Sequence, residues 1–118
     1  RFIWGKYDCW SIVTDWFKET KNIEIKYWNR PQKIKDFLNN PQFEYALPKL
    51  NFVKQPTNKN IKEGDVLLFQ SITGNLDHVA VYIGENMILN HNIKALSCRE
   101  LFDLKYQKAL KAVYRYAA

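Results

Sequence analysis

Two side chains of this sequence have the chemistry of a thiol nucleophile and its base. Cys9 follows Asp8, a residue type that caps helices, so its sulfur is expected at the first turn of a helix. The partial positive charge at a helix start favours the thiolate, the form in which cysteine attacks a carbonyl. His78 opens a predicted strand, from which an imidazole can take the thiol proton and return it to a leaving amine. The alternative interpretations are a small buried cysteine and a structural histidine.

A third polar residue should orient the imidazole through its other nitrogen, and Asn90 and His91 compete for this place. If residues 84–86 form a three-residue hairpin turn, His78 pairs with Asn92, and Asn90 becomes its diagonal neighbour about 7–8 Å away by Cα. A two-residue or four-residue turn would bring His91 to that face instead. The last turn residue is an asparagine, which tolerates the left-handed conformation that a three-residue turn needs there. We therefore expect Asn90 to be the orienting residue.

The elements that must position these residues divide the chain into a helical half and a β half. The apolar spacing predicts a helix from about residue 9 to 19, and a second helix that starts near Pro31 and stops before Pro41. Residues 41–60 are rich in proline, asparagine and glutamine, and we expect a loop there with at most one helical turn.

The second half reads as an antiparallel sheet. A turn over residues 63–65 leads into a continuous apolar run, which predicts a buried strand, and the hairpin follows it. The pattern S-x-x-E over residues 97–100 predicts a short helix through about residue 102, and residues 112–116 predict a last strand. Cys98 belongs to that short helix, has no histidine predicted near it, and is interpreted as structural. Helices followed by an antiparallel sheet define the α+β class.

Composition limits the remaining possibilities. The 118 residues, 47% of them hydrophobic, are treated as one domain over 1–118, or as a domain cut from a longer chain, because the first residue is Arg1. The net charge of +6 favours polyanions, but no run of five like charges indicates specific nucleic-acid binding. No apolar run approaches the length of about 18 residues that a membrane span needs. Two cysteines and two histidines without close spacing indicate neither a metal site nor a cofactor.

Three short motifs together resemble the NlpC-type cell-wall peptidases, which are papain-like cysteine peptidases in the broad sense. They are YDCWSIV at residues 7–13, EGDVLLF at residues 63–69 and HVAVYIG at residues 78–84. The Asp-Cys-Trp form is most similar to the branch found in phage tail-tip assembly proteins. The resemblance covers about residues 2–19 and 61–116, and the stretch 20–60 matches no known pattern.

This resemblance implies a cofactor-free endopeptidase acting on peptidoglycan stem peptides, typically at the bond between the γ-carboxyl of D-glutamate and a diamino acid. The nucleophile of the family falls on Cys9 and its base on His78. Its third residue, commonly histidine, falls on Asn90, and Ser11 stands where the family often has glycine. The resemblance also implies action at the bacterial cell wall or periplasm, by a secreted or virion-associated protein that is free, fused to other domains or part of a phage tail tip.

Two other functions are compatible with the same residues. One is a non-catalytic phage-tail or wall-binding module of the same fold, and the other is a related thiol amidase or acyltransferase toxin. Tyr7, Trp10 and Tyr82 are candidates for substrate contacts, with core packing as the alternative for each. If Cys9 is activated as described, iodoacetamide should modify it faster than Cys98 at neutral pH.

Overall fold

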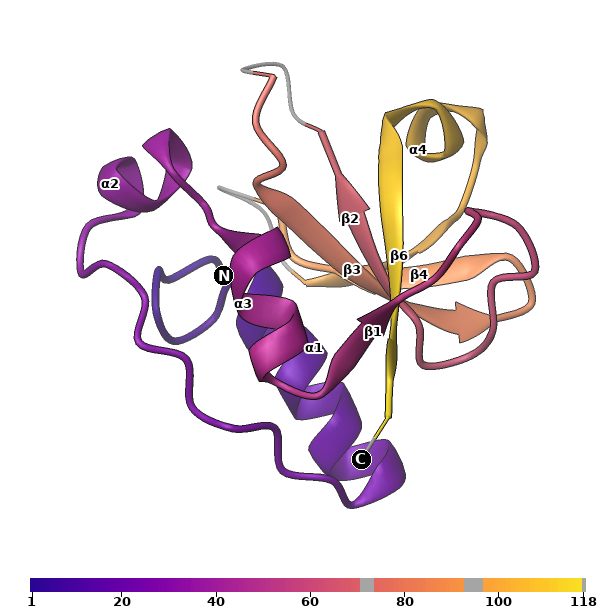
Figure 1. The fold of residues 1–118 in the computed structure, drawn as a ribbon, viewed down its shortest axis with the longest axis horizontal. Coiled ribbons are helices and arrows are strands. Elements are labelled where there is room, and N and C mark those ends of the chain that lie inside the picture. The colour runs from indigo at the N-terminus through magenta and orange to yellow at the C-terminus, as the bar shows by residue number, and fades with distance from the viewer. Residues whose placement is uncertain (71–73, 93–96, 118) are drawn as a thin grey trace.

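The computed structural model describes residues 1–70, 74–92 and 97–117 and has the predicted α+β fold (Figure 1). A six-stranded antiparallel sheet has α1 on one face and α4 on the other. In chain order, the elements are α1 (Cys9–Trp16), η1 (Phe17–Lys21), α2 (Ile34–Asn39), α3 (Phe43–Lys49), β1 (Phe52–Lys54), β2 (Val66–Phe69), β3 (His78–Gly84), β4 (Met87–Asn90), β5 (Cys98–Leu101), α4 (Leu104–Ala109) and β6 (Leu110–Tyr116).

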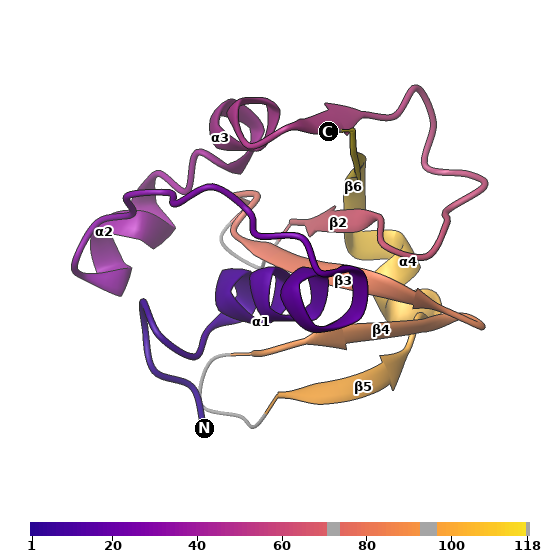
Figure 2. The same ribbon diagram turned by 90° about the horizontal axis from the view of Figure 1, so that it is seen from below.

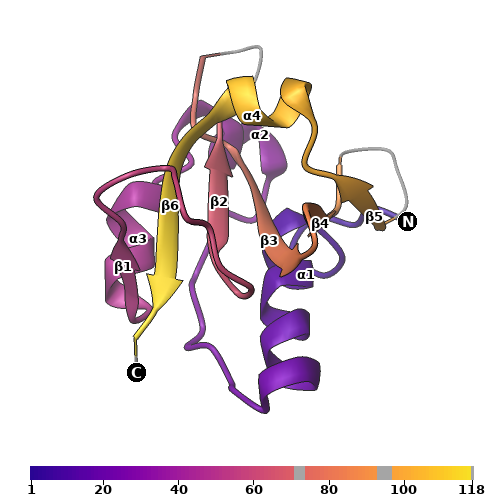
Figure 3. The ribbon, with the colours of Figure 1, turned by 90° about the vertical axis from the view of Figure 1, so that its right-hand side faces the viewer.

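The strands are ordered β1-β6-β2-β3-β4-β5, and Figure 3 shows them side by side in this order. Seen from below, α1 crosses the sheet over β3 and β4 (Figure 2). Because side chains alternate along a strand, β2 is buried on both faces, which explains its continuous apolar run. Val66 and Leu68 join the core under α1, whereas Leu67 and Phe69 join the core under α4.

The first helix forms as predicted but ends differently. α1 continues into η1, a wider helical turn of the π type, which stops at Asn22 in the left-handed conformation (φ 56°). Trp10 lies in the core rather than at a surface, since it is only 4% exposed and packs edge-on against Trp28 and Phe52. Its position matches the core-packing alternative and not a wall of an open cleft.

The stretch 41–60 contains more structure than the sequence predicted. It forms α3 and β1, and it buries Phe43, Leu47 and Phe52 almost completely. α3 even includes Pro48 in its last turn. Burial of three large apolar side chains outweighs the loop-like content of proline and asparagine here.

The helix predicted over 97–102 is wrong, because these residues form strand β5, which pairs with β4. The capping-box interpretation fails because the Glu100 carboxylate binds two side chains, the amide of Asn90 and the hydroxyl of Tyr106. The helix begins later, at α4, where Asp103 Oδ1 accepts from the Tyr106 backbone N–H at 3.3 Å.

The β3–β4 hairpin has the expected register, but its turn differs from the predicted one. The turn has two residues, Glu85 and Asn86, both left-handed (φ 52° and 60°), where three were predicted. A register shift between Tyr82 and Gly84 adds the missing residue as a bulge. The pairing beyond the bulge, with Tyr82 opposite Ile88, is therefore the one that a three-residue turn would give.

Candidate active site

Cys9 is the first residue of α1, and it is buried at 6% exposure. Burial raises the pKa of its thiol to about 12. A hydrogen bond from the Val79 backbone opposes this rise, the charge of Asp8 adds to it, and the charge of Arg30 opposes it. The sequence predicted that the helix start would favour the thiolate. In the structure, burial instead raises the thiol pKa, which favours the thiol over the thiolate.

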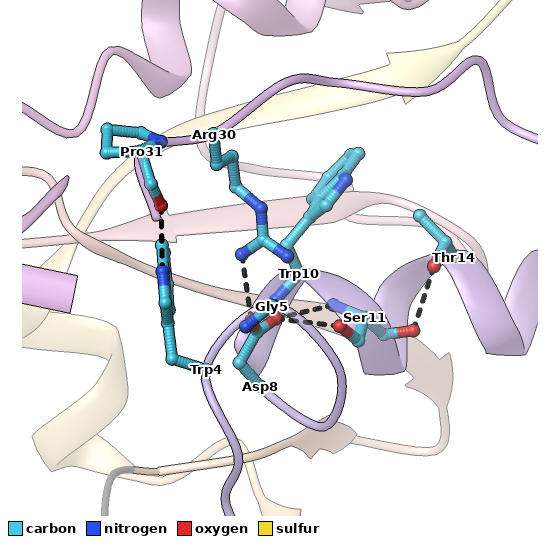
Figure 4. Close-up of polar contacts among 8 residues, drawn as sticks. All are labelled: Trp4, Gly5, Asp8, Trp10, Ser11, Thr14, Arg30 and Pro31. Atoms are coloured by element: carbon cyan, nitrogen blue, oxygen red, sulfur yellow. Dashed lines mark hydrogen bonds and ion pairs between the residues drawn. The ribbon is translucent and has the colours of Figure 1, made fainter. Parts of the chain in front are cut away.

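The residue before Cys9 organises a set of contacts that we call the Asp8 cluster: Gly5, Asp8, Ser11 and Arg30 (Figure 4). Asp8 Oδ1 accepts from the Ser11 N–H and the Ser11 Oγ, both at 2.9 Å, and from the Trp10 N–H at 3.1 Å. Asp8 Oδ2 accepts from the Gly5 N–H at 2.6 Å and lies 3.0 Å from Arg30 Nη1. Burial opposes ionisation of Asp8, but these contacts together lower its pKa. The predicted helix cap is confirmed, and it is ionised.

Arg30 lies between η1 and α2, and the sequence interpretation did not identify it. Its guanidinium carbon lies 4.5 Å from the centre of a Trp4 ring, and the Trp4 Nε1 donates to the Pro31 carbonyl at 2.9 Å (Figure 4). A fully buried aspartate such as Asp8 requires a cation or several hydrogen-bond donors around its carboxylate. Nothing in the irregular stretch around Arg30 indicates which cation it is.

His78 and Asn90 are in contact, within a second set that we call the Asn90 cluster: His78, Asn90, Asn92, Glu100 and Tyr106. His78 Nε2 lies 3.2 Å from Asn90 Oδ1, which also accepts from Asn92 Nδ2 at 2.9 Å. Asn90 Nδ2 donates to Glu100 Oε2 at 2.8 Å, and the Tyr106 hydroxyl donates to the same oxygen. Asn90 is therefore the neighbour of the imidazole, as the hairpin pairing predicted.

The surroundings of His78 favour a neutral ring. Burial lowers the pKa of His78, and this effect outweighs the opposing hydrogen bond from Asn90 and the charges of Asp77 and Glu100. His91, the competing candidate, packs edge-on against Phe2, with 5.3 Å between the ring centres.

Cys9 approaches the same end of β3 but does not pair with the imidazole. Its sulfur lies beside the backbone of Val79, the residue after His78. The His78 ring packs 5.9 Å from the Phe69 ring, measured between centres. Among residues 1–70, 74–92 and 97–117, no hydrogen bond joins Cys9 to His78. The structure thus brings His78 and Asn90 together. It places the Cys9 sulfur beside the backbone of Val79, the residue that follows His78 in β3.

The other two predicted substrate contacts occupy different environments. Tyr7 is 48% exposed and lines a cavity of about 270 Å³ together with Asp8, Ser11 and His91. Tyr82 packs against the ring of Phe102, and its hydroxyl accepts the Asn86 N–H at 2.8 Å in the hairpin turn. Tyr7 therefore faces open space beside the start of α1, whereas Tyr82 stabilises the hairpin.

The described part of the chain contains no group of three or more His, Cys, Asp or Glu side chains arranged to hold a metal ion. None of its helices combines the length and the apolar character of a membrane-crossing segment.

Comparison with known proteins gives consistent matches. Residues 1–115 match the sequence profile of the NlpC/P60 family. The chain is 25% identical over 121 residues to tail tip assembly protein K of Escherichia phage N15, covering 98% of this chain and 47% of that protein. It is 28% identical over 120 residues to tail tip assembly protein K of Escherichia phage lambda, covering 100% of this chain and 58% of that protein. The chain thus spans about half the length of these curated relatives.

A solved structure, that of NlpC1 from Trichomonas vaginalis, superimposes with a TM-score of 0.58 at 18% identity. The match covers 97% of this chain and 37% of that one. At this identity the likeness shows a shared fold.

Proposed function

Because the chain belongs to the NlpC/P60 family, whose members are generally peptidoglycan hydrolases, we propose that it is a cysteine peptidase of bacterial cell walls. Its substrate is a peptidoglycan stem peptide, cut at the amide bond between the γ-carboxyl of D-glutamate and a diamino acid. One observation carries this proposal. Cys9 opens α1 beside the Val79 backbone, while the adjacent His78 is hydrogen-bonded to Asn90.

In the proposed reaction, the Cys9 sulfur attacks the amide carbonyl, and His78 Nδ1 takes the thiol proton. The C–N bond then breaks, His78 returns the proton to the departing amine, and an acyl-enzyme remains. A water molecule, deprotonated by His78, hydrolyses the thioester and restores the thiol. The Cys9 backbone N–H can stabilise the oxyanion, because it is the first of α1 and no described residue accepts a hydrogen bond from it.

Before substrate binds, we propose a thiol and an uncharged imidazole rather than a thiolate and an imidazolium. Burial raises the pKa of Cys9 to about 12, and burial also lowers the pKa of His78. Both shifts favour the proton on sulfur. We therefore assign proton transfer from the Cys9 sulfur to His78 Nδ1 to the reaction itself.

The substrate side of the proposal is built around Tyr7. Its cavity is lined by Ser11, Ile12 and Asp15 of α1 but by neither Cys9 nor His78, so we assign it to a part of the stem peptide away from the reacting carbonyl. The net charge of +6 raises the local concentration of anionic wall polymers. The relatives are tail tip assembly proteins of phages, so we place the activity at the bacterial wall, delivered by a virion or a secreted protein.

The test is digestion of purified peptidoglycan, with the released peptides identified by mass spectrometry. Cys9→Ser and His78→Ala should each lower the rate by at least about 10³-fold, as loss of a nucleophile or its base does in peptidases. Asp36→Ala, an exposed change in the first turn of α2, is the control and should retain the rate, as should wild-type protein with a chelator. Absence of new amine termini with the wild-type protein would refute the peptidase assignment.

A second candidate is a non-catalytic wall-binding module. The burial of the Cys9 sulfur and its lack of a hydrogen bond to His78 favour it. Co-sedimentation with intact cell-wall sacculi separates the two functions. A binding module would sediment with the sacculi and release no peptide, and Cys9→Ser would change neither result.

A further inference from the structure

The orientation of the Asn90 side-chain amide is imposed by its neighbours. Glu100 Oε2 accepts from Asn90 Nδ2 at 2.8 Å and from the Tyr106 hydroxyl. An ionised carboxylate offers only acceptor sites, so the NH₂ side of the amide must face Glu100 and its carbonyl must face His78. A reversed amide would put its oxygen against the carboxylate and its NH₂ against the NH₂ of Asn92.

Glu100 is held in its acceptor form by the same contacts. Burial alone would raise the pKa of Glu100, but the hydrogen bonds from Tyr106 and Asn90, aided by the charge of Lys105 and the Cys98 thiol, lower it overall. At neutral pH the carboxylate therefore has no proton to donate, and the Asn90 carbonyl stays directed at the imidazole.

The amide orientation fixes where the imidazole carries its proton. Asn90 Oδ1 can only accept, so the ring nitrogen that faces it, His78 Nε2, must be the N–H of the neutral ring. We propose that Glu100 is a positioning residue that, through Asn90, holds His78 in the Nε2-protonated tautomer. This leaves the lone pair on Nδ1, the atom that receives the thiol proton, so the inference rests on the proposed peptidase function for its purpose.

Tyr106 completes the arrangement from α4. It is only 8% exposed, its ring packs 5.4 Å from that of Phe69, and Asp103 caps its helix. Its hydroxyl holds the Glu100 oxygen that also binds the Asn90 amide. Strand β5 and helix α4, which lie outside the Cys-His-Asn set, thereby take part in positioning the base.

Nuclear magnetic resonance can measure this tautomer directly on the intact chain. In ¹⁵N-labelled protein, long-range ¹H–¹⁵N spectra distinguish the protonated from the unprotonated nitrogen of each imidazole. The chain has two histidines, so His91→Gln assigns the signals of His78. At a pH where the ring is neutral, we expect Nε2 to be protonated and Nδ1 to be free.

Glu100→Gln tests the cause, because a glutamine amide can donate as well as accept and so permits Asn90 to turn over. The Nδ1-protonated tautomer should then appear, and kcat should fall by about tenfold or more with KM unchanged. Glu100→Asp, which keeps the carboxylate, should restore part of kcat. Glu85→Gln, the same change in the exposed hairpin turn, should leave tautomer and kcat as in the wild type.

Two results would overturn the inference. One is a wild-type spectrum with the proton on Nδ1, which needs no variant and therefore decides the matter even if Glu100→Gln fails to fold. The other is a folded Glu100→Gln protein with the wild-type tautomer. Failure of the wild-type protein to cleave peptidoglycan would count against the proposed function instead, because the tautomer measurement does not depend on turnover.

Discussion

The Asp8 cluster and the Asn90 cluster flank the start of β3 and use opposite kinds of chemistry. The Asp8 cluster is a buried ion pair, in which a carboxylate caps α1 and binds Arg30. The Asn90 cluster is a chain of directed hydrogen bonds, in which an amide links an imidazole to a carboxylate. The first fixes the backbone that carries the sulfur, and the second fixes the protonation of the base.

Charged groups act on both Cys9 and His78, but burial has the larger effect on the pKa of each. The negative charge of Asp8 disfavours the Cys9 thiolate, and Arg30 offsets part of that effect. The uncharged amide of Asn90 separates His78 from Glu100, so the imidazole gains direction without gaining a full counter-charge. Burial, rather than this separation, is the main cause of the raised pKa of Cys9 and the lowered pKa of His78.

Removing the ion pair should have the largest effect on stability. Asp8→Ala would leave the Arg30 side chain, 9% exposed, without its counter-charge and α1 without its cap. We expect a loss of about 3–5 kcal/mol in the free energy of unfolding, measured by urea denaturation. Asp36→Ala, an exposed aspartate in the first turn of α2, is the control, and its loss should stay below about 1 kcal/mol. Equal losses would show that Asp8 has no special role.

Thiol alkylation tests whether the reacting pair is neutral. The sequence predicted faster modification of Cys9, but its burial and raised pKa lead us to expect the opposite order. Cys98 lies on the edge strand β5 and is only partly buried. Iodoacetamide should therefore modify Cys9 at least about tenfold more slowly than Cys98 at pH 7, as followed by mass spectrometry on Cys9→Ser and Cys98→Ser proteins. Faster reaction at Cys9 would indicate a preformed thiolate, and Cys9 and His78 would then not both be neutral.

A smaller effect is expected from the titration of His78. Its pKa is lowered in the folded protein, so the unfolded chain binds the proton first as the pH falls below 6.5. The stability that this group contributes is thus complete above pH 6.5 and is lost as the pH falls through the folded pKa. The ¹H NMR titration of the His78 ring should have a lower midpoint in the folded protein than in the urea-unfolded protein. A higher midpoint in the folded protein would show that Glu100 and Asp77 dominate over burial.

The smallest effect concerns the hairpin that places Asn90 beside His78. Glu85 adopts φ 52° in a turn that favours asparagine followed by glycine. Glu85→Asn should stabilise the protein by about 0.5 kcal/mol, seen as a higher denaturation midpoint with unchanged slope. Glu85→Val, a β-branched side chain in the same left-handed position, should destabilise it.

Contacts between residues that are close in the sequence could be predicted, whereas contacts between distant residues could not. The Asp8 cap and the pairing of the β3–β4 hairpin follow from neighbouring residues, and both were predicted correctly. The roles of Arg30 and Glu100 were missed because their partners, Asp8 and Asn90, lie at a distance along the chain. Arg30 lies in an irregular stretch, and the pattern that contains Glu100 was interpreted as a capping box. The burial of Cys9 depends on the packing of α1 against β3, so its thiol pKa could not be read from the helix start alone.

The stretch 42–54 gives the same lesson for the fold. The sequence predicted a loop over 41–60 from its proline, asparagine and glutamine content, yet Phe43, Leu47 and Phe52 complete the core under α1. Phe43 packs against Trp10 and Phe52 packs against Phe17, partners that are distant along the chain. Local pattern therefore predicted the contact between His78 and Asn90 better than it predicted the packing of the core.

The Asp8–Arg30 ion pair also constrains how this protein can vary. Residues 22–33 contain neither helix nor strand, so their outward-facing positions are open to change. Arg30 nevertheless has to reach the beginning of α1, which constrains the length of this stretch, while Ile23, Ile25 and Trp28 pack against the core. A deletion in it would act at a distance, loosening the helix that presents the sulfur without touching any reacting group.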